Sequence, residues 1–260
     1  VQEHFPQYSA AFNVMSGIKQ ADVARVVALY ALGGVYADID VEAVRGFDEL
    51  IEAAAEARQG VLLGEENAVH TVLLEKRLSR RLVSNAVMAS APKHPFWLQV
   101  LEEIFGATSC GTDPVLCTGP RLIDRLSLEH LRQRPACGID GRGCLARLPF
   151  EYFSPHIARW NAGGMARSCK ELAGDSQELE EDHADAVLGA CERLERTLDY
   201  PAALRGQRTF AVHHWQCSWC REDSELSSTI LIDEVMWQVG NETLLADMGF
   251  SNSLNMYSSR

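Results

Sequence analysis

The sequence predicts an α/β protein in which helices flank a mainly parallel sheet. Short apolar segments typical of strands alternate along the chain with longer segments of helical periodicity. A helix between two strands brings the chain back to the end of the sheet where it started, so such alternation favours parallel pairing. The composition supports a folded domain, because 47% of the 260 residues are hydrophobic and 23% are charged. A chain of this length is also long enough to bury a sizeable core.

The first predicted helix and strand are the most sharply marked. Apolar residues recur at helical spacing from Val23 to Tyr30, and Gly33-Gly34 can close that helix in a left-handed conformation. Residues 35–37 then form a short apolar segment, which predicts a buried strand ending at Asp38-Ile39-Asp40.

The remaining elements follow from the same periodicities. Pro95 and Pro120 favour helix starts, since proline is accommodated in the first turn of a helix. We expect further helices over 47–59, 96–105, 120–131, 175–198 and 230–248, and further strands over 61–63, 82–90, 145–153 and 209–214. Residues 135–144 predict an inserted loop, and the helix over 175–198 is acidic. No linker divides the chain, so we expect one domain over residues 1–260.

Charge and hydropathy exclude some classes of partner. The chain has 24 Lys and Arg against 36 Asp and Glu, a formal net charge of −12. Broad nucleic-acid binding needs a surplus of basic side chains, so no nucleic acid is expected as a partner. The best apolar run, Val26 to Ala37, is too short to cross a membrane. The chain begins with Val1 rather than Met, and we expect it to be a piece of a longer protein whose membrane anchor lies upstream.

The cysteines favour an oxidising compartment. All eight lie in the second part of the chain: Cys110, Cys117, Cys137, Cys144, Cys169, Cys191, Cys217 and Cys220. An even number in a loop-rich region predicts disulfides in a secretory lumen. Buried thiols in a cytosolic protein are the alternative.

The first feature with chemical content is the Asp38-x-Asp40 pair at the end of a predicted strand. Alternation along extended backbone places both carboxylates on one side and Ile39 on the other. Two carboxylates at the mouth of a sheet can bind Mg²⁺ or Mn²⁺, which keeps positions open for phosphate oxygens. By itself the pair is a weak signal, because an isolated Asp-x-Asp is more often part of a solvated loop.

Several segments around this pair carry a resemblance to a known family. Residues 21–25, 29–30 and 33–40 resemble the signature of glycosyltransferase family 32, the DXD-containing sugar-binding region. Mannosyltransferases of glycan and inositol-phosphoceramide pathways are among its members. Further blocks match in the same order, at residues 84–90 with 94–97, at 118–120, and at 213–215 with 218–219. The matched blocks extend from Lys19 to Trp219, which is most of the chain.

This resemblance implies a Rossmann-like GT-A fold, of which this chain lacks the N-terminal strand. It also implies metal-dependent transfer of a hexose from a nucleoside-diphosphate sugar, with retention at the anomeric carbon. Asp40 corresponds to a direct ligand of Mn²⁺ or Mg²⁺, and Asp38 to a group that contacts the donor and reaches the metal through water. His213 corresponds to a C-terminal metal ligand. Adjacent histidines in a strand point to opposite faces, so His214 is an alternative to His213 rather than a second ligand.

The other matched residues would bind the donor. Asp22 and Arg25 correspond to residues that bind hydroxyls of the donor sugar, although a pair three residues apart on a helix is also an ordinary surface ion pair. Tyr36 belongs to the same block. Ser218 and Trp219 would close over the diphosphate, with a core tryptophan as the alternative for the latter.

Two further blocks are less specific. Asn85 would bridge donor and acceptor in catalysis, or it satisfies a turn at the end of a strand. Thr118-Gly119-Pro120 is expected to serve mainly backbone geometry at the start of a helix.

The resemblance further implies GDP-mannose as the favoured donor, a lipid head group or glycan as the acceptor, and a membrane-anchored protein of the Golgi or another secretory lumen. Because relatives bind the nucleotide base with a segment that precedes the point equivalent to Val1, we expect this chain alone to bind the donor weakly. A non-catalytic nucleotide-sugar or glycan-binding module on the same fold is one alternative. A zinc site formed by His213, His214, Cys217 and Cys220 is another.

Overall fold

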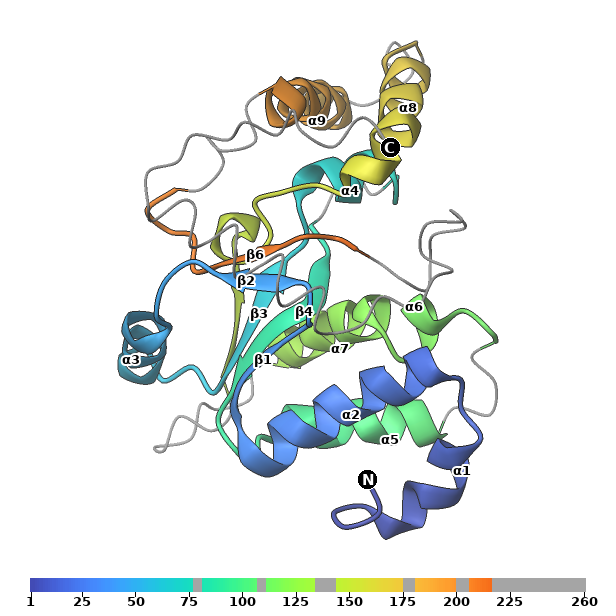
Figure 1. Cartoon of the computed structure of the whole chain (residues 1–260), viewed down its shortest axis with the longest axis vertical. Coiled ribbons are helices and arrows are strands. Elements are labelled where there is room, and N and C mark those ends of the chain that lie inside the picture. The colour runs from blue at the N-terminus through green and yellow to red at the C-terminus, as the bar shows by residue number, and fades with distance from the viewer. Residues whose placement is uncertain (77–80, 107–110, 134–143, 175–180, 200–205, 217–260) are drawn as a thin grey trace, which may run out of the picture. The chain divides into compact units, whose positions relative to one another are not determined.

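A computed structural model describes residues 1–76, 81–106, 111–133, 144–174, 181–199 and 206–216 (Figure 1). All of them belong to one compact unit, Val1–Gln216. Three groups of predicted residues lie outside the described ones: the helix over 230–248, residues 135–143 of the loop predicted over 135–144, and the candidates Ser218 and Trp219.

Helices and short strands alternate along this unit, as the sequence predicts. The first part contains η1 (Pro6–Tyr8), α1 (Ser9–Asn13), α2 (Gly17–Leu32), β1 (Gly34–Ala37), β2 (Val41–Ala43) and α3 (Asp48–Glu56). The middle part contains β3 (Val61–Glu65), α4 (Ala68–Leu73), β4 (Val83–Ser90), α5 (Pro95–Gly106), α6 (Pro114–Cys117), α7 (Pro120–Gln133) and β5 (Leu145–Leu148). The last part contains η2 (Phe150–Tyr152), η3 (Arg159–Asn161), α8 (Ala162–Gly174), α9 (Glu181–Asp199) and β6 (Ala211–His213).

The central sheet is mixed, which corrects the expectation of a mainly parallel sheet. Its described strands have the order β1-β4-β3-β5, with β4 antiparallel to both neighbours and only β3 and β5 paired in parallel. Strands β1, β3 and β5 nevertheless point the same way, as helical crossovers require. The exception follows β3, where the connecting helix α4 has six residues and β4 has eight. A six-residue helix is about 9 Å long, whereas an eight-residue strand is about 27 Å long, so α4 by itself is too short to carry the chain back along the sheet.

Two strands differ from their predicted form. Strand β1 was expected to be buried, but Val35 is 40% exposed because β1 lies at the end of the sheet order and pairs with β4 alone among the described strands. Strand β5 ends at Leu148 rather than near Phe153, because Pro149 has no N–H to continue the ladder and the chain turns into η2.

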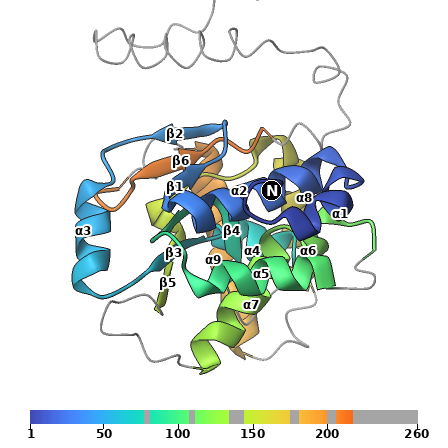
Figure 2. The ribbon, with the colours of Figure 1, turned by 90° about the horizontal axis from the view of Figure 1, so that it is seen from below.

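Two cores cover the two faces of this sheet. Helices α2, α5 and α7 pack on one face, where Val61, Leu63 and Met88 point (Figure 2). On the opposite face, Leu62 and Val87 pack against α3, η2 and the segment that leads into β6. Period-two alternation along β3 and β4 therefore divides their apolar side chains between the two cores. The short β2–β6 ladder forms a separate antiparallel sheet.

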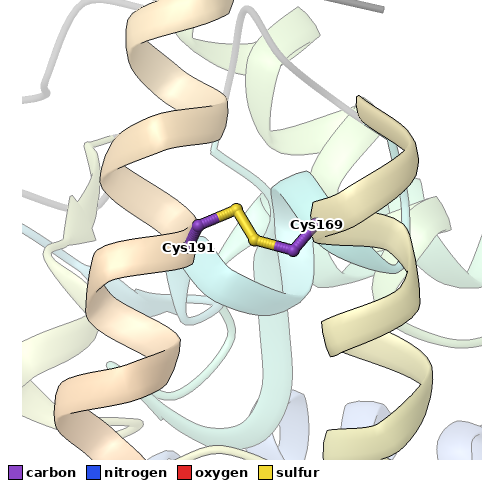
Figure 3. The surroundings of a disulfide bond; sticks show 2 residues. All are labelled: Cys169 and Cys191. Carbon is purple, nitrogen blue, oxygen red and sulfur yellow. A yellow bond between two sulfur atoms is a disulfide. The ribbon is translucent and has the colours of Figure 1, made fainter. Parts of the chain in front are cut away.

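A third cluster joins α4, α8 and α9, which pack against one another (Figure 1). The disulfide Cys169–Cys191 links α8 to α9 beside α4, with the two Cα atoms 5.8 Å apart (Figure 3). Cys117 and Cys144 are disulfide-bonded as well. For the described cysteines, the prediction of disulfides rather than free thiols is confirmed. No helix among the described residues is long and apolar enough to cross a membrane.

Candidate active site

The turn from α2 into β1 places the Asp38-x-Asp40 pair. Gly33 ends α2 with a φ of 68°, and its N–H donates to the carbonyl of Leu29 at 3.0 Å. A Cβ on Gly33 would lie 2.7 Å from the Pro92 nitrogen, so this close approach requires glycine. The chain then runs along β4, where the Asp38 N–H donates to the Ala86 carbonyl at 2.8 Å. The local sequence thus fixes Asp38 where β1 ends and Asp40 in the following turn.

Strand pairing brings His213 to the same place from far along the chain. Val41 in β2 stands opposite His213 in β6. Asp38, Asp40 and His213 each offer a ligand atom, and these atoms lie within 4.8 Å of one another. Among the described residues this is a group of three side chains that could hold a metal ion.

Asp40 is held by the segment that contains His213. Its carbonyl accepts the N–H of His214 at 2.9 Å, and its Oδ2 accepts the N–H of Gln216 at 2.8 Å. His213 Nε2 lies 3.3 Å from the same Oδ2. Burial alone would raise the pKa of the Asp40 carboxyl, but the hydrogen bonds with His213 and Gln216 outweigh it and hold that pKa below its usual value. Asp40 is therefore a carboxylate at neutral pH.

His214 faces away from this group. Its Nε2 lies 3.0 Å from Oε2 of Glu42, and its side chain is 36% exposed. Of the two adjacent histidines, the structure thus brings only His213 to Asp38 and Asp40. The two rings have different carboxylate partners, so the structure gives no support to a zinc site that uses both. Cys217 and Cys220, the other residues of that alternative, lie outside the described residues.

Arg25 connects the pair to α2. Its Nη1 lies 3.0 Å from Asp38 Oδ1 and donates to the Asn85 carbonyl at 2.9 Å. Its Nη2 lies 3.3 Å from Asp22 Oδ1, and the guanidinium stacks over the Tyr36 ring at 4.9 Å from the centroid. Arg25 thus joins the two acidic groups of this site.

Asp22 has a partner on each carboxylate oxygen. Asn85 Nδ2 donates to Oδ1 at 3.0 Å, and the Thr118 hydroxyl donates to Oδ2 at 2.8 Å. Asp22 is 4% exposed and Arg25 is 6% exposed, so the alternative of a helix-surface ion pair is wrong. Burial raises the pKa of Asp22, and the neighbouring Arg25 opposes the shift only in part. The Tyr36 hydroxyl donates to Asp38 Oδ1 at 2.6 Å, and burial together with this bond raises the pKa of Tyr36, which stays a neutral donor.

Thr118 is the contact that the sequence did not reveal. Its block was expected to serve backbone geometry, yet its hydroxyl holds a carboxylate that is 96 positions away in the sequence. A threonine that precedes Gly-Pro in the motif was the available signal. His94, which belongs to another block, lies away from this group and caps α5, where its Nδ1 accepts the Phe96 N–H at 3.2 Å. Burial, followed by the nearby His130, lowers the pKa of His94 to about 4.

The group formed by Asp38, Asp40 and His213 fits a divalent cation of the Mg²⁺ or Mn²⁺ kind. Carboxylate oxygens suit both ions, and an imidazole nitrogen suits Mn²⁺ in addition. With bonds of about 2.1 Å, neighbouring ligand atoms on an octahedral ion lie about 3 Å apart. The 3.3 Å between Asp40 Oδ2 and His213 Nε2 is close to that spacing. An ion here would also replace the hydrogen bond as the partner of His213 Nε2.

Part of the chain matches known proteins in sequence. Residues 1–56 match the family described as the glycosyltransferase sugar-binding region containing a DXD motif. Over these residues the match agrees with the predicted resemblance to this family. Asp22, Arg25, Tyr36, Asp38 and Asp40 all lie inside the matched residues.

Two curated relatives are named for mannosyl transfer. The chain is 32% identical over 161 residues to mannosyl phosphorylinositol ceramide synthase SUR1 of Saccharomyces cerevisiae, an alignment that covers 60% of this chain and 36% of SUR1. It is 36% identical over 87 residues to inositol phosphoceramide mannosyltransferase 3 of Schizosaccharomyces pombe, covering 34% of this chain and 19% of that protein. The chain therefore spans about a third or less of the length of these relatives.

Proposed function

We propose that this chain is the catalytic part of a retaining, metal-dependent glycosyltransferase. It would move a hexose, with mannose favoured, from a nucleoside-diphosphate sugar to a hydroxyl group of a lipid or glycan. The observation that carries the proposal is the group of Asp38, Asp40 and His213 at the end of β1, next to the buried Asp22–Arg25 pair. Its two carboxylates and three of its neighbours lie in the region that matches the family.

Asp40 and His213 would hold the cation directly, and Asp38 through water. A bound Mn²⁺ or Mg²⁺ supplies a positive charge that stabilises the leaving diphosphate. The chain's own task is to keep its ligands charged and oriented. The Gln216 N–H and the Arg25 guanidinium do this for Asp40 and Asp38 respectively.

The donor sugar would bind next to Asp22, Arg25 and Tyr36. These residues form one hydrogen-bonded network with Asp38, so a sugar hydroxyl that bonds to one of them is oriented relative to the metal site. Asn85 would act between donor and acceptor from β4, with its amide already fixed on Asp22. Ser218 and Trp219 would close over the diphosphate.

Transfer with retention would proceed by front-face substitution. The bond from the anomeric carbon to the diphosphate oxygen breaks, and the acceptor oxygen bonds to the same face of that carbon. The acceptor proton goes to the leaving phosphate. This route needs no carboxylate nucleophile, because the acceptor oxygen attacks the anomeric carbon directly. The described carboxylates of the site are engaged by Arg25, Tyr36, His213 and backbone N–H groups.

The names of the relatives favour particular substrates. Both relatives are named for mannosyl transfer to an inositol-containing ceramide, which supports GDP-mannose as donor and a lipid head group as acceptor. The disulfides support a secretory lumen such as the Golgi. Membrane association would reside in a segment outside this chain.

The test is a panel of nucleotide sugars incubated with Mn²⁺ and a form of the protein extended at its N-terminus beyond Val1, scored by the diphosphate released. GDP-mannose, UDP-galactose, UDP-glucose and UDP-N-acetylglucosamine form the panel, each with and without EDTA. The proposal predicts metal-dependent release, greatest with GDP-mannose. Binding of a donor without release under any condition would favour the non-catalytic binding module instead.

A further inference from the structure

His213 has an unusual environment for a candidate metal ligand. Its Nε2 faces Asp40, while its Nδ1 is buried and has no hydrogen-bond partner among the described residues. A histidine that ligates a metal normally donates its second ring N–H to a carboxylate or carbonyl, and that bond fixes the ring. With a cation at Nε2 in place of the Asp40 hydrogen bond, contacts other than hydrogen bonds to the described residues would have to orient this imidazole.

Trp215 provides such a contact. Its ring lies 4.2 Å from the His213 ring, centroid to centroid, at an interplanar angle of 38°. Two residues apart on extended backbone, the side chains would point the same way without being held together. Trp215 instead has a φ of 57°, a left-handed conformation that is rare for a bulky residue. This conformation accompanies the close contact of the two rings.

The Trp215 ring is itself held from the other side. The indole Nε1–H of Trp215 donates to the His156 carbonyl at 3.2 Å. The backbone carbonyl of Trp215 accepts the Trp160 Nε1–H at 2.7 Å. Its ring also meets the His70 ring in a T-shaped contact, with the centroids 4.4 Å apart and the planes at 88°. Trp215 thus lies between two histidines, one in the candidate metal site and one in α4.

His70 is a rigid support for this contact. It is 3% exposed, and its Nε2 accepts the Ala158 N–H at 2.9 Å. Since Nε2 is an acceptor, the proton of the neutral ring is on Nδ1, which donates to Glu66 Oε1 at 2.7 Å. Both ring nitrogens are occupied, so His70 cannot act as a base while these bonds last. We therefore assign His70 a packing role against the Trp215 ring.

We infer that Trp215 is a positioning residue for the metal site, holding the His213 imidazole in the orientation that presents Nε2 to the cation. The inference rests on the proposed function, because it assumes that Asp38, Asp40 and His213 bind a divalent ion. The flat ring of Trp215 replaces the hydrogen bond that Nδ1 lacks among the described residues. Loss of a hydrogen-bonding outer partner typically weakens metal binding by about 10- to 100-fold, and we expect loss of the ring that takes its place to have an effect of the same size.

The test measures binding of Mn²⁺ alone to the 260-residue chain by the loss of its free-ion electron paramagnetic resonance signal. Trp215→Phe keeps an aromatic ring against His213, and Trp215→Leu keeps apolar bulk without the ring. Tyr152→Leu is the matched control. Tyr152 is also partly buried and stacks on Phe210, at 5.9 Å between centroids, just before β6. The Tyr152→Leu substitution therefore perturbs the packing next to β6 without removing a contact of His213.

We expect Trp215→Leu to raise the Kd for Mn²⁺ by about 10- to 100-fold. Trp215→Phe should stay within about 3-fold of wild type, because a ring still packs on the imidazole. Tyr152→Leu should leave the Kd unchanged. An unchanged Kd in Trp215→Leu, or an equal loss in Tyr152→Leu, overturns the inference. A wild-type chain that binds no Mn²⁺ instead contradicts the proposed function, so the two failures are distinguishable.

A second measurement requires no variant that might lose its fold. In the wild-type chain, the Trp215 ring should displace the ring-proton resonances of His213 upfield, because the two rings are 4.2 Å apart. Random-coil positions for these resonances would show that the contact is absent in solution and would overturn the inference.

Discussion

Replacing Arg25 with methionine tests the network behind the site. Methionine keeps much of the apolar bulk of the arginine stem but removes the guanidinium, which lies 3.3 Å from Asp22 and 3.0 Å from Asp38. The two carboxylates would then lose the cation between them. The variant therefore distinguishes a buried network, in which the charges depend on one another, from a set of solvated surface charges.

The size of the effect distinguishes the two cases. Because Arg25 is 6% exposed and Asp22 is 4% exposed, the variant leaves a buried carboxylate without its positive partner. Breaking a buried pair in this way costs about 3–5 kcal/mol of unfolding free energy. A surface pair three residues apart on a helix would contribute only about 0.2–0.5 kcal/mol.

The loss should also depend on pH. Burial already raises the pKa of Asp22, and removal of Arg25 removes the main influence that lowers it. A carboxyl whose pKa is higher in the folded than in the unfolded state stabilises the fold most below its unfolded pKa, and this contribution is lost as the pH rises through the folded pKa. The variant should therefore be closest to wild type near pH 4 and fall further behind toward pH 7.

Urea unfolding at pH 5 and pH 7, followed by tryptophan fluorescence, measures both effects. The double variant Asp22→Asn/Arg25→Met should recover part of the loss, since it also removes the unpaired charge. Arg125→Met is the control, because Arg125 is 46% exposed and pairs with Glu103 and Glu129 at the surface. A loss below about 1 kcal/mol at pH 7 for Arg25→Met, as expected of an exposed pair, would refute the buried network.

Three further predictions concern the surroundings of the site. Thr118→Val removes the hydroxyl that donates to Asp22, so we expect a loss of about 1–3 kcal/mol in urea unfolding; an unchanged midpoint would contradict the assigned bond. The pKa of His94 is lowered to about 4, so the stability that this buried neutral histidine contributes should be complete above pH 6.5 and fall as the pH drops toward 4. His94→Asn, which keeps an acceptor for the helix start, should flatten that decline, and equal slopes would count against the buried histidine. Replacing Cys169 and Cys191 together with serine opens a link across 22 positions, which should cost about 3 kcal/mol; equal melting temperatures with and without the link would contradict a stabilising disulfide.

Local signals were enough to predict where the acidic pair lies. The helical period before Gly33 and the apolar segment after it predicted α2 and β1, and both are present. Period-two alternation predicted that only one of His213 and His214 meets the carboxylates, and the two rings do have different partners. These features depend on residues that are close in the sequence, where backbone geometry decides the outcome.

Strand pairing and contacts between distant segments could not be predicted from the sequence. Strand β4 is antiparallel to its neighbours, and the connection that precedes it contains the short helix α4. This helix has six residues, too few for a helical period to predict it from the sequence. Helix α8 begins with Ala162-Gly163-Gly164, a start of low helix propensity, and it is stabilised by packing on α4 and α9. The contact of His70 with Trp215 likewise joins segments that nothing in a single sequence pairs.

The central claim is that Asp38, Asp40 and His213 hold a cation that serves a nucleoside-diphosphate sugar. The most direct measurement is Mn²⁺-dependent release of diphosphate from GDP-mannose by wild type, Asp40→Asn and Glu42→Gln, each in the form extended at its N-terminus beyond Val1. Glu42 is a matched control, since it lies two residues from Asp40 and its carboxylate faces His214 instead. The account predicts that Asp40→Asn abolishes the Mn²⁺-dependent release while Glu42→Gln retains it. Wild-type hydrolysis and transfer by Asp40→Asn in the presence of Mn²⁺ would contradict the metal assignment.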